Sequence, residues 1–350
     1  MKNQEHPETE KVYFPPEWAP QDGVMLTWPH EGTDWAGMLT EVEETYLEIA
    51  REVIRREKLL VVCHDIAKIS QRFTEEELTS IGFYEIPTND TWARDHGPLS
   101  TFVQGKPVIN DFQFNGWGSK FDARLDNLIT RNLFIQRAFL PEVQYSEYPG
   151  FVLEGGSIES DGNGTILTTT KCLLNSNRNP HHSRQEIETV LTDFSGAGKI
   201  LWLENGFLEG DDTDSHIDTL ARFCNENTIC YVHCEERNDP HFEELRKMEE
   251  QLKQFTNREG IPYHLVALPM ADPVYNQEGR RMSATYANFL ILNGAVLVPV
   301  YGQLKDREAL DILAGIFPER EVTGINCLPL IEQNGSLHCI TMQIPKGFLR

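Results

Sequence analysis

The stretch TYANFLILNGAVLVPVY (residues 285–301) carries the clearest local structural signal in the chain. Two apolar runs flank Asn293-Gly294, a dipeptide that is typical of a two-residue β-hairpin turn. Apolar residues at helical spacing follow at Leu310, Leu313 and Phe317. The run VTGINCLPL, which starts at Val322, then reads as a further strand. This part of the chain is therefore predicted to form a hairpin, a helix and a strand.

The same order of elements recurs about five times along the chain, with a spacing of roughly 60 to 85 residues. Helices are predicted to begin near residues 37, 122, 183, 241 and 305. The third opens with Ser183 and Glu186, which form a capping-box pattern. The predicted inward-facing residues of the first four helices are Val42, Tyr46, Ile49 and Val53; Leu125, Leu128 and Ile129; Ile187, Val190, Leu191 and Phe194; and Phe242, Leu245, Met248 and Leu252. No Gly/Ser linker divides the chain, so one closed α/β ring is favoured over two domains, with a doubly wound sheet as the alternative.

Composition narrows the class of partner. The 350 residues are 40% hydrophobic and 24% charged, and 31 basic against 54 acidic residues give a net charge of -23. This charge argues against nucleic acid and anionic membranes and is compatible with a cationic substrate. Assembly into a homo-oligomer is left open. No apolar run is long enough to span a bilayer, and residues 1–12 are polar and expected to be frayed, which leaves 13–350 as one domain.

The seven cysteines are scattered without the spacing of a disulfide framework. Four of them lie in apolar runs: Cys63, Cys172, Cys230 and Cys327. Free thiols in a reducing cytoplasm are the simplest explanation.

Cys339 differs from these because it lies in GSLHCITMQIP (residues 335–345), beside His338, in a run that otherwise reads as a strand. Most cysteines are packing residues, whereas a nucleophilic thiol needs a proton-transfer partner and groups that hold an electrophile. Three distant segments could supply those groups: TWARDHGP (residues 91–98), LEGGS (153–157) and DSHID (214–218).

His216 and Asp218 are two residues apart, so on a strand their side chains would share one face. The surrounding EGDDTDSHID is acidic, and a solvated turn is its ordinary interpretation. A calcium loop is conceivable, but the loop glycine and distal glutamate are absent. Zinc is a second alternative at HCEERNDPH (residues 233–241) or at RNPHH, although neither has the spacing of a standard zinc site.

Trp92 and Asp95 suit a planar cation, because the ring can stack on it and the carboxylate can accept its hydrogen bonds. A polar turn is the ordinary interpretation of their segment. Glu154 precedes Gly155-Gly156, where backbone can pass close to a ligand, and otherwise reads as an acid that ends a strand.

Six ordered motifs resemble the agmatine deiminase family, within the bacterial peptidylarginine-deiminase-like group of guanidine-modifying enzymes. They are WARDHGP, FNGWGSKFD, LEGGSIESDGNGT, CLLNSNRNP, DSHID and SLHCITMQIP, and the likeness covers nearly the whole chain. It implies a single-domain, pentein-like α/β propeller of five blades. Two segments depart from the family pattern. The family usually reads EGGSIHVDGEGT, whereas here Glu159 and Ser160 follow Ile158. The family also usually reads GGNIHC, whereas here the segment is NGSLHC.

The resemblance implies hydrolysis of the agmatine guanidinium to N-carbamoylputrescine and ammonia, a step of polyamine biosynthesis. In this hypothesis Cys339 attacks the guanidinium carbon, Asp95 and Asp218 hold its nitrogens, and His216 transfers protons. Glu154 binds the guanidinium and orients His216. The walls of the pocket are Trp92 and Trp117. No metal or organic cofactor is needed. Peptidylarginine deiminase is the nearest alternative, and a zinc or cationic-ligand binding protein is a more distant one.

Agmatine is predicted to be preferred over free arginine, which carries an additional α-carboxylate. A pocket that buries this group needs a positive partner. The motif segments offer Arg94, Lys120, Arg178 and Arg184. The altered SIESDG segment is expected to shape the pocket.

Overall fold

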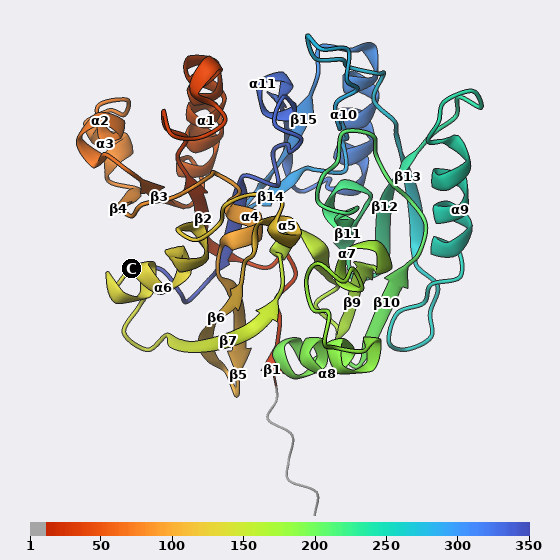
Figure 1. Ribbon diagram of the computed structural model, residues 1–350, viewed down its shortest axis with the longest axis horizontal. Helices are drawn as coiled ribbons and strands as arrows, with labels where there is room; N and C mark the ends of the chain where they lie inside the picture. The colour runs from red at the N-terminus through yellow and green to blue at the C-terminus, as the bar shows by residue number, and fades with distance from the viewer. Residues whose placement is uncertain (1–11) are drawn as a thin grey trace, which may run out of the picture.

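The computed structural model describes residues 12–350, which form an α/β fold of five small sheets (Figure 1). Every sheet contains an antiparallel strand pair joined to a parallel neighbour. The parallel neighbour is reached through a helical crossover, as parallel pairing requires. The recurring unit of hairpin, helix and strand is therefore present in the structure.

Three of the sheets have three strands each. Their orders are β10-β9-β8, β11-β12-β13 and β14-β15-β16. The strands are β8 (Ile158–Ser160), β9 (Thr165–Thr169), β10 (Lys199–Leu203), β11 (Ala221–Asn225), β12 (Thr228–His233), β13 (His264–Pro269), β14 (Leu290–Leu292), β15 (Ala295–Val300) and β16 (Glu321–Asn326). Asn293-Gly294 joins β14 to β15 as predicted, with Gly294 at φ +75°.

The other two sheets have four strands each, in the orders β1-β5-β6-β7 and β17-β2-β3-β4. Their strands are β1 (Val12–Tyr13), β2 (Gln21–Thr27), β3 (Lys58–Cys63), β4 (Ile81–Glu85), β5 (Leu99–Val103), β6 (Lys106–Gln113), β7 (Gln144–Val152) and β17 (Thr341–Pro345). The last strand, β17, pairs antiparallel with the early strand β2, so segments from both halves of the chain share one sheet.

Five helices lie around the outside of the strands (Figure 1). They are α1 (Leu39–Ile54), α6 (Ile129–Ile135), α8 (Arg184–Ser195), α9 (Phe242–Leu252) and α10 (Leu304–Ile316). Short helical turns connect the units: η1 (Ala36–Met38), α2 (Ile66–Ser70), α3 (Glu75–Leu78), α4 (Ala93–His96), α5 (Gly116–Ser119), η2 (Asp126–Leu128), η3 (Gly155–Ser157), α7 (Thr170–Leu173), η4 (Ile217–Thr219) and α11 (Leu328–Ile331). Among residues 12–350, no helix combines the length and the apolar character that crossing a bilayer requires.

The predicted capping box of α8 is present: Ser183 accepts a hydrogen bond from the Glu186 backbone, and Glu186 accepts one from Ser183. The helix predicted near residue 122 is shorter than expected. Leu125 and Leu128 are 38% and 42% exposed, so their predicted inward orientation is wrong. The chain there is a 3-10 turn, and helical spacing does not fix the inward face before Ile129.

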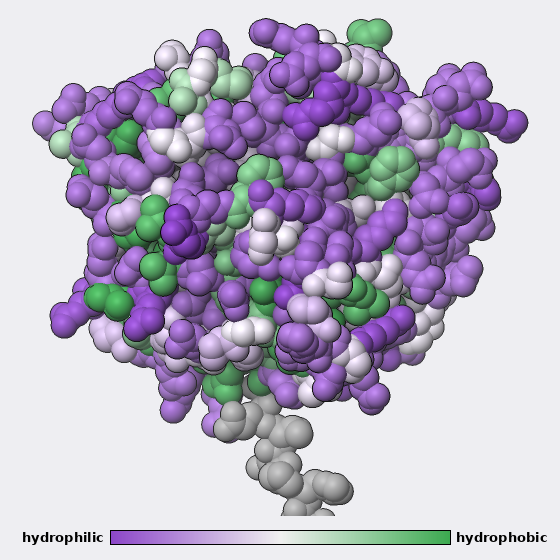
Figure 2. Space-filling model, viewed as in Figure 1, coloured by the Kyte–Doolittle hydropathy of each residue, from purple (hydrophilic) through white to green (hydrophobic). Residues whose placement is uncertain are grey.

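The surface in Figure 2 is mostly hydrophilic, with apolar residues scattered over it. The expected fraying of residues 1–12 lies outside the described residues except at Val12, which pairs with Val103.

Candidate active site

Cys339 lies in a turn immediately before β17, so its predicted place within a strand is wrong. The strand begins at Thr341, because residues 337–340 turn back on themselves through a hydrogen bond from Thr341 N to His338 O. The thiol is buried, with 6% of the residue exposed. Its Sγ atom is 3.4 Å from Asn288 Oδ1 and 3.9 Å from Asp218 Oδ2.

Asn288 is a site residue that the sequence did not identify. Its Oδ1 accepts hydrogen bonds from the backbone N–H groups of His338 and Cys339 at 2.9 and 3.3 Å, and its Nδ2 donates to Asp218 Oδ2 at 3.3 Å. Asn288 therefore joins the nucleophile's turn to the acid opposite it. The only sequence feature that could have identified Asn288 is its polar amide inside an apolar run, because a buried amide needs hydrogen-bond partners.

His216 and Asp218 both reach the site, but not from a strand. Residues Ile217–Thr219 form the 3-10 turn η4, so the predicted extended conformation is wrong. Asp214 and Ser215 have φ of +67° and +65°, which breaks any extended path into this segment. The turn buries Ile217 in the core, and its two polar neighbours are buried beside Asp95 and Cys339. Among the described residues, His216 Nε2 and Asp218 Oδ1 have no hydrogen-bond partner although both are buried.

Asp95 of α4 lies beside them. Its Oδ2 accepts a hydrogen bond from Trp117 Nε1 at 2.9 Å, and its Oδ1 accepts one from Gly156 N at 3.0 Å. His216 Nδ1 is 3.5 Å from the same Oδ1. Position 156 requires glycine because two site residues lie very close to its backbone. A Cβ atom there would be 2.7 Å from His216 Nδ1 and 2.8 Å from Asp95 Oδ1.

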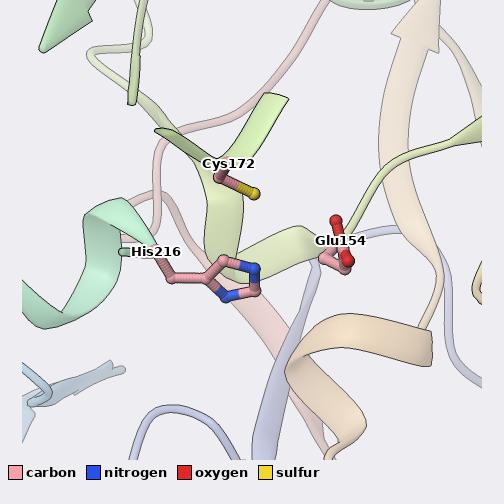
Figure 3. A group of neighbouring side chains, drawn as sticks. All are labelled: Glu154, Cys172 and His216. Carbon is pink, nitrogen blue, oxygen red and sulfur yellow. The ribbon is translucent and has the colours of Figure 1, made fainter. Parts of the chain in front are cut away.

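Glu154 is fully buried and is held by an arginine rather than by His216. Arg178 Nε donates to its two carboxylate oxygens at 3.0 and 3.3 Å. Figure 3 shows Cys172, Glu154 and His216 at the corners of a triangle, and ligand atoms of these three residues lie within 4.8 Å of one another. Cys172 was predicted only as a packing thiol; it packs against the site because α7 follows β9 directly.

A cavity leads from the surface to Cys339. Its walls include Trp92 and Trp117, whose ring centroids are 6.4 Å apart. Gly335 lies against the Trp92 ring so closely that a Cβ atom would be 2.0 Å from it. The remaining lining residues are Asp34, Asp90, Asp95, Phe121, Asp212, Thr213, Gln333 and Asn334. Within residues 12–350, no lysine or arginine lines this cavity.

The four basic residues considered for a substrate carboxylate are engaged elsewhere. Arg94 Nε donates to His338 O at 3.4 Å, behind the Cys339 turn. Lys120 Nζ lies 2.9 Å from Asp214 Oδ1, and Arg178 also pairs with Asp214. Arg184 pairs with Glu188 on the surface. Glu159 of the SIESDG segment pairs with Arg222 and is not among the residues that line the cavity.

Burial sets the protonation of the reacting groups. It raises the pKa of the Cys339 thiol well above its usual range, and the carboxylates of Asp218 and Asp95 act in the same direction. It also raises the pKa of Asp95, again with Asp218 adding to the effect. Burial lowers the pKa of His216 to about 3. Without a cation in the cavity, the thiol is therefore protonated and His216 is neutral.

Among residues 12–350, two clusters have ligand atoms close enough to be considered for a metal ion: Glu154 with Cys172 and His216, and Glu17 with Glu159 and His338. Each is already paired with a guanidinium, from Arg178 and from Arg222. A cation would have to displace that buried partner, so neither donor set fits a metal well.

The calcium and zinc alternatives concern other segments. Asp211 Oδ2 accepts a hydrogen bond from Ser215 N at 2.7 Å, and Asp214 is held by Arg178 and Lys120, so these acids brace their own turn. His233 Nδ1 lies 3.0 Å from Glu249, and His241 Nδ1 lies 2.6 Å from Asp239. The histidines of HCEERNDPH therefore have carboxylate partners of their own.

A family model described as Porphyromonas-type peptidyl-arginine deiminase matches residues 13–345. A Vibrio parahaemolyticus protein named "Putative agmatine deiminase" is 34% identical, over 99% of this chain and 100% of its own. A Porphyromonas gingivalis structure named "Putative Arginine Deiminase" is 51% identical with a TM-score of 0.94, covering 97% of this chain and 100% of that one. The C. jejuni agmatine deiminase with substrate bound is 38% identical with a TM-score of 0.91, and each chain is covered completely. The chain belongs to the Porphyromonas-type peptidyl-arginine deiminase family.

Proposed function

We propose that this protein is an agmatine deiminase, a hydrolase that converts the guanidinium of agmatine to a ureido group and releases ammonia. The observation that carries the proposal is the charge of the cavity leading to Cys339. Carboxylates line it, namely Asp34, Asp90, Asp95 and Asp212, and within residues 12–350 no basic side chain does. Agmatine is cationic at both ends, whereas free arginine would bring a carboxylate with no partner.

The guanidinium would bind between Asp95 and Asp218. Both are buried, and Asp218 Oδ1 is free to accept a hydrogen bond from it. Charge-assisted bonds to the two acids would orient the guanidinium carbon toward Cys339 Sγ. Trp92 and Trp117 would enclose the planar group, and Glu154 would complete the anionic surroundings beside His216.

The reaction then needs one proton carrier. As Sγ bonds to the guanidinium carbon, the thiol proton passes to His216, which hands it to the departing nitrogen so that ammonia leaves. This leaves a cationic S-alkylthiouronium on Cys339. Water attacks the same carbon, His216 accepts a proton from it, and the carbon–sulfur bond breaks. The ureido product leaves, Cys339 regains its proton, and the remaining proton is taken up by ammonia.

We also propose that the five sheets are the blades of a pentein-like propeller formed by one domain, residues 13–350. The repeated sheet topology and the β17–β2 pairing support this. All seven cysteines are free and buried, which supports a reducing, cytoplasmic location. The product N-carbamoylputrescine would place the enzyme in polyamine biosynthesis. The net charge of -23 favours a small cation over nucleic acid as the partner.

A substrate panel tests the proposal. Agmatine, free arginine and a peptidyl-arginine would be compared by kcat/KM from ammonia release, with the ureido product identified by mass spectrometry. We expect agmatine to exceed free arginine by roughly 100-fold, since an unpaired carboxylate in an acidic cavity is costly. Comparable values for the two would contradict the proposal, and a much higher value for the peptide would replace it with peptidylarginine deiminase.

A further inference from the structure

His338 lies immediately before Cys339, is 1% exposed, and has a carboxylate at each ring nitrogen. Nδ1 is 2.8 Å from Asp218 Oδ2, and Nε2 is 2.7 Å from Glu17 Oε2. A neutral imidazole has one donor and one acceptor nitrogen, whereas an ionised carboxylate only accepts. Both contacts can be hydrogen bonds only if His338 carries two ring protons or one of the acids is protonated.

Glu17 is held as a carboxylate by two other donors. Arg222 Nη2 donates to its Oε2 at 2.6 Å, and Ile291 N donates to its Oε1 at 2.7 Å. Burial opposes its ionisation most strongly, but Arg222, His338 and Arg94 together outweigh burial, so the pKa of Glu17 falls well below its usual range. A proton on Glu17 would point at a donor, so the proton between Glu17 and the ring belongs to His338.

Asp218 is in a similar position. Asn288 Nδ2 donates to its Oδ2 at 3.3 Å, the same oxygen that faces His338 Nδ1. Burial alone would raise the pKa of Asp218, but the hydrogen bond with His338 and the charges of His338, His216 and Arg222 together lower it. Because Oδ2 already accepts from Asn288, we assign the proton on Nδ1 to the imidazole.

A positive His338 balances the charges around it when the three neighbouring acids are ionised. Behind the Cys339 turn lie three carboxylates and two guanidinium groups, all at least nine-tenths buried: Glu17, Glu159, Asp218, Arg94 and Arg222. Glu159 pairs with Arg222 and accepts a hydrogen bond from Phe223 N at 3.2 Å. Toward the cavity, Asp218 also faces Asp95 and His216. An uncompensated buried charge is strongly destabilising, and a cationic His338 supplies the third positive charge for the three acids.

We propose that His338 is a positioning residue that carries both ring protons in the folded enzyme and fixes Asp218 as an oriented carboxylate. The proposal rests on the proposed deiminase reaction and adds a residue to it. With Oδ2 held by His338 and Asn288, Asp218 presents its Oδ1 to the guanidinium. Without the imidazolium, Asp218 would be free to rotate or to take the thiol proton instead of binding substrate.

The charge of His338 can be read directly. The protein labelled with 15N-histidine would be examined by NMR at pH 7, and the His338 signals assigned by their loss in His338→Gln. We expect both ring nitrogens to carry a proton, and Glu17→Gln to remove one of the two. A single protonated ring nitrogen in the wild type at pH 7 would overturn the proposal.

Kinetics test the role. We expect His338→Gln to lower kcat/KM for agmatine by about 100-fold, comparable with the loss of one fixed catalytic donor. Glu17→Gln should act in the same direction, and the double variant should lose less than the product of the single losses, because both act on Asp218. The control is His241→Gln, which removes an equally buried histidine from a single carboxylate, Asp239. It should keep wild-type kcat/KM.

The outcomes separate this proposal from the proposed function. If the wild type converts agmatine and His338→Gln matches it, the positioning role is wrong and the function stands. If the wild type converts no guanidine, the function is wrong, while the NMR measurement still decides the charge of His338. If His338→Gln does not fold, the His338 signals in the wild-type spectrum can be assigned from the shifts that Glu17→Gln causes in them. These spectra then test the charge of His338, and the kinetics of Glu17→Gln test its positioning role.

Discussion

The Sγ atom of Cys339 lies 3.9 Å from Asp218 Oδ2, although the two residues are 121 positions apart in the chain. This places a thiol directly beside an acid, with no cation between them. The arrangement opposes formation of the thiolate until a positive charge enters. A guanidinium in the cavity would supply that charge.

Cys339→Ala should leave less than about 1% of wild-type turnover, because the substitution removes the only proposed nucleophile. Activity is measured by ammonia release and folding by circular dichroism. Cys63→Ala is the control: Cys63 is a buried thiol of β3, outside the cavity, and should lose only about 1 kcal/mol of stability while remaining active. If Cys339→Ala retained more than a few per cent of turnover, the covalent mechanism would be wrong.

Alkylation of the free enzyme should reveal the raised pKa of Cys339. Since burial and the acids Asp218 and Asp95 raise this pKa, the thiolate fraction is small at pH 7 and grows as pH increases. The rate of iodoacetamide labelling should climb without a plateau through pH 9, above the usual cysteine pKa of about 8.5. Labelling of the Cys339 peptide is followed by mass spectrometry, with Cys339→Ala as the blank. A plateau below pH 8 would show a thiolate in the resting enzyme.

The acids at the mouth of the cavity should make agmatine binding depend on pH. Burial raises the pKa of Asp90 and of Asp212 to about 6 each. Below this pH they are protonated and lose the negative charge that attracts the cation, so KM should rise as pH falls from 7 to 5. The same measurement on arginine, whose carboxylate is repelled, should show a smaller dependence.

Asp212→Asn should raise KM for agmatine about 5-fold to 10-fold at pH 7.5 with little change in kcat, consistent with loss of one charge contact of about 1 kcal/mol. The amide oxygen can still accept the hydrogen bond that Asn334 Nδ2 gives at 2.9 Å. Asp122→Asn changes an equally charged but exposed residue that pairs with Arg124, and it should have no effect. Equal KM values for Asp212→Asn and wild type would exclude this contribution.

Gly156→Ala should lower kcat/KM by about 100-fold or more, because a small displacement of a group that holds or reacts with the substrate has a large effect on rate. The new methyl group would sit 2.7 Å from His216 Nδ1 and push it or Asp95 aside. Gly37→Ala is the matched control, since a Cβ atom there meets nothing within 4 Å. The measurement is steady-state kinetics with agmatine, and near-wild-type activity of Gly156→Ala would show that the close packing is not functional.

The sequence predicted the features that depend on near neighbours. Asn293-Gly294 forces the β14–β15 turn, and Ser183 with Glu186 caps α8, because only a few adjacent residues decide each geometry. The five repeated units followed from apolar periodicity in the same way. The ordered motifs also singled out Cys339, Asp95 and Trp92, which the structure brings to one cavity.

Predictions from local sequence patterns were wrong where tertiary packing determines the backbone conformation. The segment around Cys339 reads as a strand yet turns, and the one around Ile217 forms a 3-10 turn. In both, hydrogen bonds from distant elements replace the ladder of a sheet: Asn288 holds the Cys339 turn, and Asn288 also reaches Asp218 O. Such partners leave no periodic trace in the sequence.

The sequence by itself determined which residue types were available and which short segments form strands, helices and turns. Only the tertiary structure determined which distant residues are in contact. Strand β17 pairs with β2, Glu159 pairs with Arg222 and does not line the cavity, and His338 lies between Glu17 and Asp218. The reason is physical. Turns and helices are set by interactions within a few residues, whereas a buried charge selects its partner from whatever the packed sheets place within reach.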